Sequence, residues 1–165
     1  MVRVELHFVN TTTQPLPVTG TMHLTEAKEG TITEHANLMF YGNVGLILPP
    51  QAMATVGPTF HAIPAGRKIF GLTGHQHRLG TSFTIELSSS VTDTGKELYK
   101  NMTWDDPPLT MFTPPLVPTA GQGLRFTCNY NNTTNGIVTF GEGADQEMCF
   151  LWAYYYPDQG FDIGF

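Results

Sequence analysis

The sequence predicts an all-β fold, an antiparallel β-sandwich or jelly roll of about nine strands. Three observations support this prediction. Short segments that alternate polar and apolar residues recur along the chain, as in strands buried on one face. The 17 glycines and 12 prolines leave few windows long enough for a helix. No segment shows an apolar period of 3.6 residues, which an amphipathic helix would require.

The first half of the chain contains five predicted strands. Val2–Val9 alternates apolar residues with charged or polar ones from its first position. Gly20–Leu24 and Leu38–Asn43 are short segments of strand-like composition. Ala52–Val56 follows a double proline, and Lys68–His77 follows a Pro-Ala-Gly turn.

The second half contains five more. Ser82–Leu87 and Glu97–Lys100 are short alternating segments, and Leu109–Phe112 is bounded by a double proline on each side. Gly123–Tyr130 follows a Gly-Gln turn and places an apolar residue at every second position. Met148–Tyr156 shows the same alternation and ends in three tyrosines.

Size and charge limit the classes of protein to be considered. A chain of 165 residues fits one domain with a buried core. Hydrophobic residues make up 41% and charged residues 13%, as in a globular chain rather than a disordered one. The net charge of −6, without any Lys/Arg cluster, argues against nucleic acid or an anionic membrane as a partner. No apolar run approaches the roughly 18 residues that a membrane span needs.

Two histidines two residues apart, His75 and His77, indicate a metal site. Side chains on a strand alternate faces, so both imidazoles would point the same way and could bind one ion. Met148 offers a thioether as third donor, and soft sulfur favours copper over magnesium, calcium or manganese. Each feature alone is weak, because His-x-His pairs often lie on solvated strands and methionines usually fill cores. The glycines at 74 and 80 would permit close backbone approach beside such a site.

The chain has two cysteines, Cys128 and Cys149, both in segments with strand-like alternation. A bridge between neighbouring strands is geometrically reasonable, and two buried free thiols explain the pattern equally well. A bridge would place the protein in an oxidising compartment. If Cys149 points inward, its neighbour Met148 points to the opposite face.

The other histidines have no partner at a ligand spacing. His7 lies on the polar side of its predicted strand, where a ligand and an exposed side chain are both plausible. Solvent exposure explains His23 and His35. The sequence contains no nucleophile elbow, phosphate loop, dinucleotide fingerprint or zinc-protease motif.

Together these segments resemble the C-terminal domain of the copper type II, ascorbate-dependent monooxygenases. This is the family of peptidylglycine alpha-hydroxylating monooxygenase and dopamine beta-hydroxylase. The resemblance covers nearly the whole chain, and the order and spacing of its pieces make it specific. The matching segments are Glu5–Phe8, His75–Gly80, Gly121–Cys128, Glu147–Cys149 and Tyr154–Tyr156.

The resemblance implies a set of site residues. His75, His77 and Met148 match the ligands of the family's catalytic copper, one ion per domain. Cys128 and Cys149 match a family disulfide, which implies an extracytoplasmic protein, secreted or periplasmic. The activity implied is hydroxylation of a substrate C–H bond with molecular oxygen, with ascorbate as the reductant.

His7 matches one ligand of the second, electron-supplying copper of the family. The other histidines of that site belong to an N-terminal domain, so we expect this chain alone to lack efficient turnover. Residues 1–165 are accordingly expected to form a single copper-binding β-sandwich domain, the C-terminal half of a longer two-copper monooxygenase. No signal peptide is visible, and a strand at the first residue suggests a chain cut from something longer.

The sequence departs from the peptidylglycine enzyme at informative positions. Thr73, Phe150 and Trp152 replace polar side chains that hold a peptide carboxylate there, and Phe60 stands at a cysteine position of a second disulfide. These replacements favour a more apolar or aromatic substrate over a peptide ending in glycine. Two other interpretations stay open: a non-catalytic copper carrier or sensor, and an adhesion or carbohydrate-binding jelly roll with an incidental histidine pair. An upstream domain with further histidine ligands would favour the enzyme.

Overall fold

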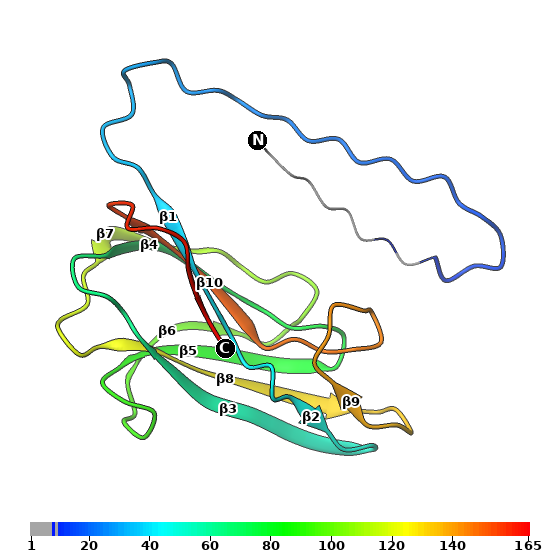
Figure 1. Cartoon of the computed structure of the whole chain (residues 1–165). Coiled ribbons are helices and arrows are strands. Elements are labelled where there is room, and N and C mark those ends of the chain that lie inside the picture. The colour runs from blue at the N-terminus through cyan, green and yellow to red at the C-terminus, as the bar shows by residue number, and fades with distance from the viewer. Residues whose placement is uncertain (1–7, 9) are drawn as a thin grey trace. The chain divides into compact units, whose positions relative to one another are not determined.

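The computed structural model describes residue 8 and residues 10–165. The chain divides into two compact units, Met1–Thr33 and Glu34–Phe165. All eleven strands of the described residues belong to the second unit. Within this unit two sheets face each other as layers (Figure 1). The predicted all-β sandwich is therefore confirmed, with eleven strands in place of about nine.

The strands range from two to eleven residues in length. They are β1 (Asn37–Gly42), β2 (Ile47–Leu48), β3 (Ala52–Ala62), β4 (Lys68–His75), β5 (Gly80–Ser88), β6 (Lys96–Asn101), β7 (Thr110–Leu116), β8 (Gly123–Asn132), β9 (Val138–Thr139), β10 (Phe150–Tyr156) and β11 (Asp162–Gly164).

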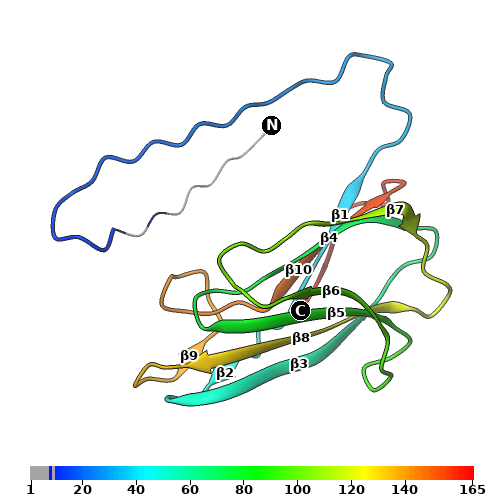
Figure 2. The same ribbon diagram turned by 180° about the vertical axis from the view of Figure 1, so that it is seen from behind.

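One layer is a five-stranded sheet with the order β11-β1-β10-β4-β7, and the other is a four-stranded sheet with the order β3-β8-β5-β6. Strands β2 and β9 form a separate short pair. Neighbouring strands are antiparallel throughout, apart from β1 and β11, which are parallel. Figure 2 shows the four-stranded layer from behind, with β8 between β3 and β5.

The core lies between the two layers and follows the period of two expected of strands. In β10 the residues Leu151, Ala153 and Tyr155 are fully buried, whereas the residues between them are only half-buried. Phe126 of β8 and Ile85 of β5 close the core from the opposite sheet. The alternation that predicted β8 and β10 from the sequence thus identifies the residues of each strand that face the core.

Several predicted strand boundaries were wrong. Gly20–Leu24 is not a strand: its side chains are all exposed, and alternation alone cannot form a ladder without a partner strand. Lys68–His77 ends at His75, and Met148–Tyr156 begins only at Phe150, because these two residues form the last pair of the β4–β10 ladder. Val2–Val9 falls almost entirely outside the described residues.

Candidate metal centre

The histidine pair lies where β4 ends. His75 is the last residue of the strand and faces Phe150 of β10 across the ladder. His77 follows in the turn that leads to β5. The centroids of the two imidazole rings are 5.1 Å apart, and the rings are nearly perpendicular. Two imidazoles bound to one ion through bonds of about 2.0–2.1 Å would have centroids roughly 5–6 Å apart.

Residues 146 and 147 hold His77 in place. The backbone N–H of His77 donates to one carboxylate oxygen of Glu147 at 2.8 Å, and the N–H of Leu79 donates to the other at 2.7 Å. The Nδ1–H of His77 donates to the carbonyl oxygen of Gln146 at 2.9 Å. Because a carbonyl can only accept, this contact assigns the proton to Nδ1 and leaves the Nε2 lone pair free for a metal.

Burial changes the proton affinity of two of these groups. The pKa of His75 is lowered to about 4, first by burial and second by the neighbouring His77. At neutral pH the His75 ring is therefore uncharged, as a metal ligand must be. Burial also raises the pKa of Glu147, although the two backbone N–H groups act against this change.

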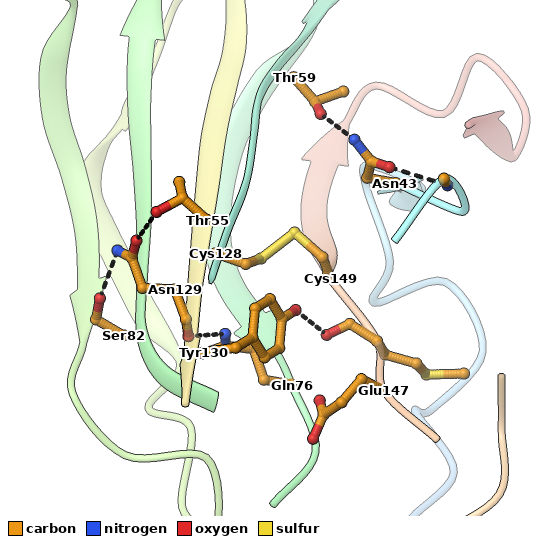
Figure 3. The surroundings of a disulfide bond; sticks show 12 residues. Asn43, Thr55, Thr59, Gln76, Ser82, Cys128, Asn129, Tyr130, Glu147 and Cys149 are labelled. Carbon is orange, nitrogen blue, oxygen red and sulfur yellow. Dashed lines mark hydrogen bonds between the residues drawn. A yellow bond between two sulfur atoms is a disulfide. The ribbon is translucent and has the colours of Figure 1, made fainter. Parts of the chain in front are cut away.

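Met148 is half-buried and follows Glu147 directly, while the next residue, Cys149, is fully buried. Cys149 forms a disulfide with Cys128 of β8. The hydroxyl of Tyr130, two residues further along β8, donates to the carbonyl oxygen of Met148 at 2.6 Å. Figure 3 shows the disulfide with Tyr130 and Glu147 beside it. The disulfide implied by the resemblance is confirmed, and Met148 is only half-buried where Cys149 is fully buried.

Two glycines allow the turn between β4 and β5 to pack closely. A Cβ atom at Gly74 would lie 2.5 Å from the ring of Phe83 in the core. At Gly80 it would lie 2.7 Å from the side chain of Gln76, which is buried and donates to the carbonyl of Asn129. Any larger residue at either position would displace these neighbours. The glycines beside the histidines therefore have a packing role.

An aromatic cluster adjoins the histidine pair on the outer face of the five-stranded sheet. It consists of Phe40, Phe140, Phe150, Trp152 and Phe165. The ring of Trp152 stands edge-on to that of His75, with centroids 5.6 Å apart. Phe40 packs against Trp152 at 5.1 Å and against Phe150 at 4.9 Å. The surface next to the histidines is thus apolar.

The sequence predicted some of these residues and not others. The structure brings His75 and His77 together and places Met148 next to the residue that binds the His77 turn. His7 lies outside the described residues. Glu147 and Tyr130 were missed as supporting residues. Their only sequence signal was position, since Glu147 precedes Met148 and Tyr130 lies two residues after Cys128 on the same strand face.

Residues 43–163 match the family described as "Copper type II ascorbate-dependent monooxygenase, C-terminal domain". The chain belongs to this family. No individual curated protein matches it. Membership implies dependence on copper and ascorbate, and use of a substrate and oxygen. The disulfide and the family together fit an extracytoplasmic location. None of the described residues forms a helix long and apolar enough to cross a membrane.

The donor set fits the copper that the family implies. Among the described residues, His, Cys, Asp and Glu form no group of three able to hold an ion, so within this part of the chain a third ligand would be of another residue type. A thioether is such a ligand, and with two neutral imidazoles it makes a soft site suited to Cu(I). The free Nε2 of His77 and the lowered pKa of His75 meet the requirement for unprotonated nitrogen donors.

Proposed function

We propose that His75, His77 and Met148 bind the copper ion at which this monooxygenase domain hydroxylates a substrate C–H bond. The observation that carries this proposal is the pair of neighbouring imidazole rings, whose centroids are 5.1 Å apart. Both His77 contacts, to its ring and to its amide, come from the two residues that precede Met148. Bound copper would supply the redox chemistry that uses molecular oxygen, with ascorbate as electron source.

The residues of this chain would hold the metal and shape its surroundings. The carbonyl of Gln146 orients the His77 ring and keeps its Nε2 free, while the low pKa of His75 keeps protons from competing at neutral pH. With two nitrogen donors and one sulfur donor from the chain, bound copper would keep open coordination positions. The aromatic cluster excludes water from one side of the site.

A partner domain belongs to the same proposal. The family is defined as a C-terminal domain, which supports a longer protein with an N-terminal half. His7 would contribute to a second copper site completed by that half. We therefore propose that residues 1–165 alone bind one copper per domain without efficient turnover, in a secreted or periplasmic protein.

A copper titration of the full 165-residue chain tests the ligand set. We expect wild-type protein to take up one Cu(I) or one Cu(II). His75→Ala should lose stoichiometric uptake of both ions, because one imidazole cannot hold either tightly. Met148→Ala should weaken Cu(I) by about 10–100-fold and Cu(II) much less, because the thioether is a soft ligand. Equilibrium competition with chelators specific for each oxidation state measures both affinities.

Met53→Ala is a matched control, because Met53 is exposed on β3 in the other sheet. It should bind both ions as the wild type does. Equal Cu(I) affinity of the Met148 and Met53 variants would contradict the proposed sulfur ligand. Multiple turnovers by the 165-residue chain with ascorbate and oxygen would contradict the need for a partner domain.

The aromatic cluster supports an apolar or aryl substrate. Trp152 lies beside His75, and its cross-strand neighbour Thr73 carries no charge that could hold a carboxylate. We expect aryl compounds to quench tryptophan fluorescence of the copper-loaded chain with micromolar to millimolar affinity. Trp152→Ala should abolish the quenching, whereas Trp104→Phe, at an exposed tryptophan, should preserve it. Saturable binding restricted to peptides ending in glycine would refute this substrate class.

A further inference from the structure

The segment that carries Met148 lies outside the regular sheets. It precedes β10, and the β4–β10 ladder begins only at Phe150. A methionine side chain has three rotatable bonds, so the position of its sulfur is not defined unless the backbone that carries it is fixed. The contacts that fix the backbone of this segment therefore limit the positions that the sulfur can reach.

Two buried side chains hold the segment, one from within it and one from β8. Glu147 is fully buried, and its carboxylate oxygens accept the N–H groups of His77 and Leu79. Tyr130 is also fully buried, and its hydroxyl donates to the Met148 carbonyl at 2.6 Å. Figure 3 shows both side chains close to the disulfide.

We infer that Tyr130 and Glu147 are positioning residues that hold Met148 at the histidine pair, an inference that rests on the ligand set proposed above. Glu147 connects the sulfur-bearing segment to the turn of His77. This contact keeps the ring nitrogen of His77 and the sulfur of Met148 in a fixed position relative to each other. Tyr130 fixes the same segment to β8, next to the disulfide of Cys128. The two side chains have different hydrogen-bond targets. Glu147 binds the turn of a nitrogen ligand, His77, and directly precedes the sulfur ligand, whereas the Tyr130 hydroxyl donates to the backbone carbonyl of the sulfur ligand.

Two conservative variants of the 165-residue chain separate these roles. Tyr130→Phe removes one oxygen and should weaken Cu(I) by about 10–100-fold while Cu(II) affinity stays as in the wild type. Glu147→Gln turns one acceptor into a donor that faces a backbone N–H, and should weaken both ions. X-ray absorption of the Cu(I) protein should show a weaker copper–sulfur contribution in each variant. The electron paramagnetic resonance of the Cu(II) protein should change only for Glu147→Gln.

Asn132→Ala is the control for a purely structural defect. Asn132 is fully buried and donates to the carbonyl oxygens of Leu48, Pro49 and Gly136, none of which belongs to the histidine turn or to the Met148 segment. The Asn132→Ala variant should melt at a lower temperature than the wild type. Its Cu(I) and Cu(II) affinities, X-ray absorption and electron paramagnetic resonance spectra should stay as in the wild type. Parallel melting curves show how much stability each variant loses.

Different outcomes would contradict the positioning role of Tyr130 and Glu147 and the proposed ligand set. Wild-type Cu(I) affinity in Tyr130→Phe, together with weak Cu(I) binding by Met148→Ala, would overturn the positioning role and leave the ligand set intact. Unchanged Cu(I) affinity in Met148→Ala would instead remove the ligand set itself. If Glu147→Gln does not fold, the Cu(I)-selective loss in Tyr130→Phe decides the matter alone.

Discussion

Removing the Cys128–Cys149 disulfide should lower the free energy of unfolding by about 3 kcal/mol. The two cysteines are 21 positions apart, and a loop of this length restricts the unfolded chain by roughly that amount. Both residues are fully buried, so alanines in their place would also leave unfilled volume. The expected fall in melting temperature is about 6–12 °C for a domain of this size.

Chemical denaturation of Cys128→Ala/Cys149→Ala, beside wild type with and without a reductant, measures the loss. Reduced wild type should lose somewhat less stability than the double variant, because its two thiols still fill the core, and adding reductant to the double variant should change nothing. A loss below about 1 kcal/mol would show that the bridge adds little to the constraint already imposed by the sheets. We also expect Cu(I) affinity to fall, because the bridge holds the residue next to Met148.

Much of the sandwich could be predicted because its strands obey a period of two. Gly123–Tyr130 covers all but the last two residues of β8, and the later part of Met148–Tyr156 coincides with β10; from their second position on, the buried residues of both strands alternate. Strands β2, β9 and β11 have two or three residues each, too few to show a period. Such short strands exist because a neighbouring strand happens to pair with them, which a local pattern does not encode.

The residues of the candidate site were likewise predictable only in part. Spacing and the family resemblance indicated the two histidines, Met148 and the disulfide. The residues that orient these ligands were not predictable, because each acts through a contact between segments far apart in the chain. Glu147 acts on backbone N–H groups 68 and 70 positions away, and Gln146 acts through its carbonyl oxygen, which any residue would supply. Side-chain identity therefore predicts ligands better than it predicts what orients them.

Asp162→Asn should destabilise the sandwich by about 3 kcal/mol, through the anchoring of its last strand, β11. The carboxylate of Asp162 accepts the hydroxyl of Tyr41 at 2.9 Å and pairs with the guanidinium of Arg67. The Arg67 side chain is 6% exposed and also lies over the ring of Tyr155, 4.4 Å from its centroid. Removing one partner of such a pair leaves a buried charge uncompensated, which costs about 3–5 kcal/mol. The 26% exposure of Asp162 places this case at the lower end.

A double-mutant cycle isolates the charge effect from the loss of packing. Arg67→Met keeps much of the apolar contact with Tyr155 and removes the buried charge. Asp162→Asn should therefore cost much less stability in the Arg67→Met background than in the wild type. Urea denaturation of the four proteins gives the coupling energy, which we expect to exceed about 1 kcal/mol. Additive losses would mean that Asp162 acts through its hydrogen bond to Tyr41, and that the ion pair contributes nothing of its own to holding β11 against β1.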